Sequence, residues 1–82
     1  MHFVIINEWA LDDQSETKCG VLAVAHSLEE AKATFKELVL EDIELADTRD
    51  WDVYTCTDTE FDAGLTGEYS SNHTVMKIVE VE

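Results

Sequence analysis

The side chains best suited to chemistry are three histidines and two cysteines, and neither set has the spacing of a known site. His2, His26 and His73 show no pairing of the HxxxH kind that zinc sites use. Cys19 and Cys56 are 37 positions apart without a CxxC pair, which predicts two buried free thiols and no disulfide framework. We therefore expect no catalytic residue, no bound metal and no cofactor.

Three acids at alternate positions, Asp58, Glu60 and Asp62, are the nearest approach to a cation-binding loop. An EF-hand loop has glycine at its sixth position and a bidentate glutamate at its twelfth, where this chain has Ala63 and Tyr69. Carboxylates on a loop still attract calcium or magnesium weakly. The pattern predicts solvated loop charge, and a weak cation-binding or enzymatic domain is the last of three functional hypotheses.

The strongest signal is the charge, because nineteen acidic and five basic side chains in 82 residues give a formal net charge of −14. Such a surface repels nucleic acids and anionic membranes, so neither is expected as a direct partner. The expected partner is a basic protein surface. The first residues lack a basic leader followed by a long apolar run, which predicts the cytoplasm of a bacterium or of a phage-infected host.

The hydrophobic pattern predicts four strands. Phe3–Trp9 and Cys19–His26 are rich in apolar residues, and we expect them to pair as an antiparallel hairpin. Trp51–Thr57 and Thr74–Val81 have strand composition as well. Segment 58–72 contains two glycines and two serines and is predicted to be a loop, with a short hairpin over 65–69 as an alternative.

A helix is predicted between the second and third strands. Ser27 followed three positions later by Glu30 is a capping pattern, so the helix should begin at Leu28 and end between residues 45 and 49. At 100° per residue, an apolar sector faces the core, four glutamates lie opposite, and Asp42 falls inside the apolar sector. The apolar sector comprises Leu28, Ala31, Phe35, Leu38, Val39, Leu45 and Ala46, and the opposite acidic stripe comprises Glu30, Glu37, Glu41 and Glu44.

These elements predict a single α+β domain over residues 1–82. It is a two-layer ββαββ fold, in which one amphipathic helix packs on one face of a mainly antiparallel four-stranded sheet. Such a sheet is nearly 20 Å wide and a helix is about 10 Å across, so one sheet face needs another cover. The candidates are the 58–72 loop with Phe61, Leu65 and Tyr69, a second copy of the chain, or a partner protein.

The favoured functional hypothesis is a non-catalytic domain that binds a basic protein surface. DNA carries one charge per about 1.7 Å of duplex, so −14 matches roughly 24 Å, enough for mimicry of nucleic acid. The alternatives are charge that serves solubility alone and a structural or regulatory homodimer that closes the apolar sheet face. The predicted contact residues are Asp12, Asp13, Glu16, Glu30, Glu37, Glu41, Glu44, Asp58, Glu60 and Asp62, with the aromatic residues Trp9, Trp51 and Tyr69.

In size and charge the chain resembles the small acidic anti-restriction and anti-CRISPR proteins of phages and mobile elements, a class without a common sequence pattern. The resemblance implies a protein that fills the cationic groove of a nucleic-acid-binding enzyme in place of phosphate and so inhibits it. Association would then be fast and sensitive to salt, while a few buried aromatic contacts would set the lifetime of the complex.

Overall fold

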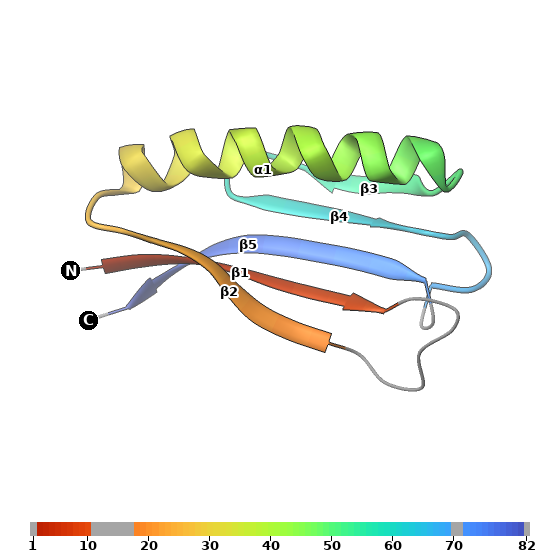
Figure 1. Cartoon of the computed structure of the whole chain (residues 1–82), viewed down its shortest axis with the longest axis horizontal. Coiled ribbons are helices and arrows are strands. Elements are labelled where there is room, and N and C mark those ends of the chain that lie inside the picture. The colour runs from red at the N-terminus through yellow and green to blue at the C-terminus, as the bar shows by residue number, and fades with distance from the viewer. Residues whose placement is uncertain (1, 11–17, 70–71, 82) are drawn as a thin grey trace.

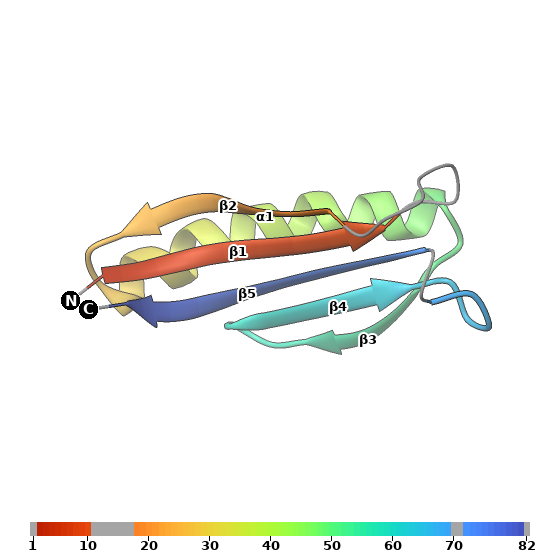
Figure 2. The same cartoon turned by 90° about the horizontal axis from the view of Figure 1, so that it is seen from below.

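The computed structural model describes residues 2–10, 18–69 and 72–81, which form one helix on an antiparallel sheet of five strands (Figure 1). The elements in chain order are β1 (His2–Ala10), β2 (Lys18–Ala25), α1 (Leu28–Thr48), β3 (Asp52–Cys56), β4 (Glu60–Gly64) and β5 (His73–Val81). Their order across the sheet is β2-β1-β5-β4-β3. Seen from the sheet side, α1 lies behind the strands and leaves the near face bare (Figure 2).

The predicted α+β fold with one helix on one sheet face is confirmed, and so is the hairpin of β1 and β2. The predicted count of four strands is wrong, because β4 lies in the segment expected to be a loop. Its residues alternate: Phe61 and Ala63 are buried, whereas Glu60 is exposed and Asp62 is half-buried. This alternation is the signal of a half-covered strand, and the neighbouring glycines and acids concealed it.

A short turn of threonines joins β3 to β4. The Thr57 hydroxyl oxygen accepts hydrogen bonds from the backbone amides of Thr59 and Glu60, at 3.3 and 3.0 Å. The Thr57 amide also donates to the Glu60 carbonyl oxygen at 2.8 Å. The side chain thus satisfies backbone donors that the turn would otherwise expose, which fixes where β4 begins.

Both edge strands contain one residue that has no partner in the register. Ile5 pairs with Ala23 and Ile6 pairs with Val21, so Leu22 of β2 is an extra residue. In the same way Val53 pairs with Ala63 and Thr55 pairs with Asp62, so Tyr54 of β3 is an extra residue. Each is a bulge, which locally increases the twist of its strand.

Helix α1 begins as its sequence predicts. The Ser27 hydroxyl accepts the Glu30 amide at 3.1 Å, and the acidic side chains of Glu29 and Glu30 occupy the first turn. A negative charge there interacts favourably with the positive end of the helix dipole. The start at Leu28 and an end between residues 45 and 49 are both confirmed.

The C-terminus of α1 is closed by a Schellman turn. The Trp51 amide donates to the Ala46 carbonyl at 2.8 Å, and the Asp50 amide donates to the Asp47 carbonyl at 3.3 Å. Asp50 adopts a left-handed conformation with φ of 57°, which short polar side chains tolerate better than most. The turn brings Trp51 under the helix, where it is only 7% exposed.

The core is one apolar layer between α1 and the sheet. Phe35 and Phe61 are completely buried, and Ile5 and Met76 meet them from β1 and β5. Val39, Ala46 and Trp51 extend this layer toward the C-terminal end of α1. Leu28 and Leu45, expected in the packed sector, are exposed, because the apolar stripe that contacts the sheet is narrower than the sequence indicates.

We predict that Ser27→Ala lowers the free energy of unfolding by about 1 kcal/mol, since the Glu30 amide loses its acceptor. Urea unfolding followed by circular dichroism would measure the loss. Ser27→Asn is the matched control, because asparagine also caps helices well and should keep most of the stability. An equal loss in both variants would show that the cap hydrogen bond is not what Ser27 contributes.

Candidate protein-binding surface

The acidic stripe exists as an exposed surface along α1. Glu30, Glu37, Glu41 and Glu44 are all exposed, and Ala31, Phe35, Val39 and Ala46 are buried on the opposite side of the helix. Along its whole length α1 carries seven acids and two lysines. Within the part of the chain that the structure describes, no ion pair engages the four stripe glutamates. Their charge is therefore uncompensated.

Two of the few cations are already engaged. The Lys32 ammonium lies 3.1 Å from the Asp58 carboxylate in the β3–β4 turn. The Arg49 guanidinium lies over the Trp51 ring, 5.7 Å from its centroid. Both contacts lie away from the acidic stripe, so neither lowers the negative charge there.

The predicted loop acids do not form one surface. Asp58 pairs with Lys32, Glu60 lies opposite Lys77 in the β4–β5 register, and Asp62 accepts a hydrogen bond from Tyr69. Over residues 2–10, 18–69 and 72–81, no group of three or more histidine, cysteine, aspartate or glutamate side chains is placed to hold a metal ion. The other predicted contact residues, Asp12, Asp13 and Glu16, lie outside the described residues.

The three aromatic candidates lie in three different places. Trp51 belongs to the core and has little surface to offer a partner. Trp9 is half-buried on the helix side of β1, and Tyr69 is half-buried against the opposite face of the sheet. Of the three, Trp9 alone combines partial exposure with a place beside α1.

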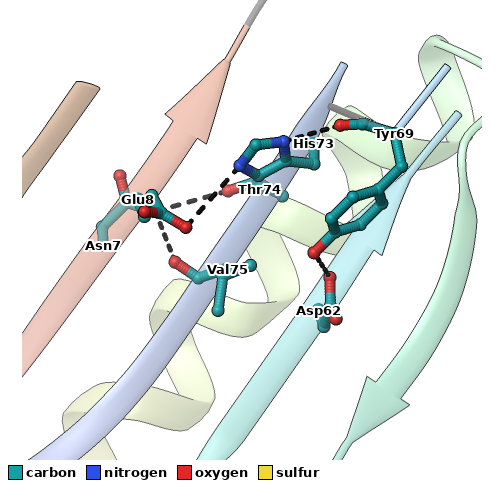
Figure 3. A network of polar contacts seen from close by, with 7 residues as sticks. All are labelled: Asn7, Glu8, Asp62, Tyr69, His73, Thr74 and Val75. Carbon is teal, nitrogen blue, oxygen red and sulfur yellow. Dashed lines mark hydrogen bonds and ion pairs between the residues drawn. The ribbon is translucent and has the colours of Figure 1, made fainter. Parts of the chain in front are cut away.

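A polar network occupies one end of the uncovered sheet face (Figure 3). The Tyr69 ring stacks on the His73 ring, with centroids 4.7 Å apart, and its hydroxyl donates to the Asp62 carboxylate at 2.5 Å. His73 Nδ1 lies 2.7 Å from the Tyr69 carbonyl oxygen. A carbonyl oxygen only accepts, so Nδ1 carries a proton, and Nε2 faces the Glu8 carboxylate at 3.7 Å.

This network packs the Tyr69 ring against the sheet. Burial, followed by the hydrogen bond to Asp62, raises the pKa of Tyr69 above its usual range, which keeps the phenol a hydrogen-bond donor. A β-carbon added to Gly64 would lie 2.6 Å from the Tyr69 ring, so the ring packs where only glycine leaves room. In the sequence, Gly64 is the residue that could have indicated this contact. A glycine in this segment is equally typical of a loop, so the sequence alone does not predict the packing of Tyr69.

Two further predictions, on the burial of the cysteines and on the cover of the second sheet face, differ from the structure. Cys19 and Cys56 are free but exposed, so the prediction of buried thiols is wrong. The proposed cover of the second sheet face by the 58–72 segment is largely wrong as well. Phe61 and Leu65 pack on the helix side, and Tyr69 reaches the bare face only at the Gly64 end.

Asp42 is the least satisfied polar group of the described chain. One of its carboxylate oxygens is buried without a hydrogen-bond partner among the described residues. Burial, with a smaller contribution from the Glu41 charge, raises the pKa of Asp42 above its usual range. The side chain lines a pocket of about 280 Å³ together with Trp9, Trp51 and Arg49.

No protein-family model, no curated protein and no solved structure matches this chain. In the part of the chain that is described, no helix has both the length and the apolar character to cross a membrane.

We predict that Asp42→Asn stabilises the fold at pH 7, because asparagine keeps the shape of the side chain and removes a charge that burial and Glu41 disfavour. A raised pKa in the folded state means that folding favours the protonated acid. The wild type therefore loses stability as the pH rises from the ordinary aspartate pKa through the folded one.

Urea unfolding at pH 7 and near pH 3 would test this, because the two proteins should differ at pH 7 and converge at the lower pH. Glu44→Gln is the control, since it removes the same charge from the exposed side of α1. If Glu44→Gln stabilises as much as Asp42→Asn, general charge repulsion rather than the buried carboxylate is responsible.

Proposed function

We propose that this chain is a non-catalytic binding domain that engages a basic protein surface through the acidic stripe of α1. The single observation that supports the proposal is the exposure of all four stripe glutamates on one side of a helix that packs by its other side. Opposite charge accelerates encounter with a cationic surface and disfavours anionic partners.

The dimensions of α1 support a sharper form of this proposal, an inhibitor that takes the place of nucleic acid. Its 21 residues extend about 31 Å, a length over which one DNA strand presents roughly nine phosphates. The helix carries seven acids and two lysines over the same length, and the four stripe glutamates share one exposed side. A nucleic-acid-binding enzyme of the kind blocked by anti-restriction or anti-CRISPR proteins is therefore the target class we propose.

Replacing Glu37, Glu41 and Glu44 together with glutamine should leave the fold intact and weaken capture of basic partners several-fold. The tagged domain would be used to capture proteins from a bacterial lysate at roughly 50 and 300 mM salt, and duplex DNA would be added to the captured complexes. We expect nucleic-acid-binding proteins at low salt, their loss at high salt, and their release by the DNA.

The matched control removes the same charge elsewhere, through Asp50→Asn, Glu60→Gln and Glu80→Gln, three exposed positions outside α1. This variant should capture as well as the wild type. Equal weakening by both triple variants would mean that net charge acts without a site, and capture that is insensitive to salt and to DNA would contradict the proposal.

A second candidate function, self-association, is favoured by the apolar surface of the bare sheet face. We name the group Val4, Ile6, Val21, Val24, Val75 and Val79 the valine patch. Val21 and Val24 are 62% and 61% exposed, and the other four are half-buried. They alternate with the core residues of β1 and β5. Val24, Val4 and Val79 pair across three adjacent strands, and Val21 pairs with Ile6.

The charge distribution is compatible with a symmetric dimer through this patch. The six patch residues are uncharged, and the acids Glu8 and Asp62 flank Val75 at one end of the patch. The acidic stripe lies on the other side of α1, so two copies packed by their sheets hold the stripes about three layers of 10 Å apart. Five strands at about 4.8 Å spacing make the bare face about 20 Å wide, and the valine patch lies on its β2, β1 and β5 part.

The combination Val21→Thr and Val24→Thr should weaken this dimer about a hundredfold. Each substitution removes one methyl group, and a two-fold dimer counts each substitution twice. Light scattering over a concentration series would measure the mass, for which one chain is 9.3 kDa. Leu40→Gln is the control, since Leu40 is equally exposed but lies on α1. A wild-type monomer at the highest concentration would rule out this candidate.

A further inference from the structure

The pocket beside Asp42 lies between the C-terminal half of α1 and the ends of β1 and β5. Trp9 and Thr74 form its sheet side, Asp42 and Arg49 its helix side, and Trp51 closes it from the turn after α1. Its volume of about 280 Å³ lies just below the range of sites for drug-sized ligands. The pocket is therefore suited to an occupant the size of one side chain.

The Asp42 carboxylate gives the pocket a hydrogen-bond acceptor that lacks a donor. One of its oxygens is shielded from solvent and has no partner in the described chain. A carboxylate turns over a broad range about its terminal bond, so either oxygen can meet a donor that enters the pocket. A half-buried carboxylate with one shielded, unpartnered oxygen gains from a charged donor beside it.

The two tryptophans make the same pocket favourable for a planar cation. Arg49 holds its guanidinium over the Trp51 ring at 5.7 Å and, among the described contacts, forms no ion pair with Asp42. Trp9 is half-buried and, among the described residues, has no ring or cation on its face. One aromatic wall is thus occupied by the chain's own arginine and the other is free.

Other occupants fit these features less well. An anionic ligand would meet the field of a protein with a net charge of −14. A small ammonium group would satisfy Asp42 but would not stack on Trp9. A guanidinium has a planar face for the ring and an edge with two donors for the carboxylate.

We infer that this pocket receives an arginine side chain of the basic partner, with the guanidinium between Trp9 and Asp42. The inference depends on the proposed function for the source of the arginine. In that complex the acidic stripe attracts the partner at long range, and the pocket holds one of its arginines in place. The stripe lies on the exposed side of α1 and the pocket on the side of β1, so the partner must contact both sides of the helix.

The test is a titration with N-acetyl-arginine amide, followed by tryptophan fluorescence and by the indole NH signals in NMR spectra. The chain has two tryptophans, and both line the pocket, so each method reports on the site itself. We expect a saturable change with N-acetyl-arginine amide and none with the uncharged analogue N-acetyl-norleucine amide. The same response to both compounds would overturn the inference.

Variants separate the pocket from the general charge. Asp42→Asn should weaken binding of the arginine compound at least about tenfold, since a hydrogen bond to a charged group contributes that much. Asp47→Asn removes the same charge at an exposed position of α1 outside both the stripe and the pocket and should change the affinity less than twofold. Equal effects of the two variants would overturn the inference.

Two variants distinguish a pocket that binds no arginine from an acidic stripe that captures no basic protein. The triple glutamine variant of the acidic stripe should bind N-acetyl-arginine amide nearly as well as the wild type, although it captures basic proteins poorly. Conversely, Asp42→Asn should still capture basic proteins at low salt but release them faster. No saturable change with the wild type would overturn the pocket and leave the stripe as the proposed binding surface.

Discussion

The structure depends on a single apolar layer, in which Phe35 of α1 meets Phe61, Ile5 and Met76 of the sheet. In a chain of 82 residues with a net charge of −14, this layer must outweigh the repulsion among the acids. In the described chain one helix packs on five strands, so no second apolar layer adds to the stability of the fold. Every acid among the described residues is outside this layer or at its margin, and of these Asp42, at the margin, has a buried oxygen without a partner.

The same constraint divides the surface into two unlike faces. Packing by a narrow stripe turns the glutamates of α1 away from the sheet, and it leaves the opposite sheet face with exposed valines and the stacked pair of Tyr69 and His73. The acidic face attracts cationic surfaces over a long range. The apolar face contributes free energy of association only where another surface contacts it. A partner or a second copy can thus use either face without competing for the other.

The sequence predicts those elements whose signals are local. The Ser27 cap, the length of α1 and the hairpin of β1 with β2 follow from residue types and spacing, and so does the exposure of the stripe. Strand β4 was missed because its alternation covers five residues among glycines and acids. The Tyr69 network and the pocket at Asp42 join residues that are distant in the chain, and no local pattern reports which distant side chains will meet. Only Asp42, an acid in an apolar sector, indicated that something unusual lies there.

The bulges at Leu22 and Tyr54 make both outer strands poor templates for the addition of another strand. Both outer strands offer unpaired backbone groups, and the chain has no proline to block them. An extra residue in each outer strand interrupts the even spacing of donors and acceptors that an incoming strand would need. Growth by strand addition is therefore discouraged at both sides of the sheet.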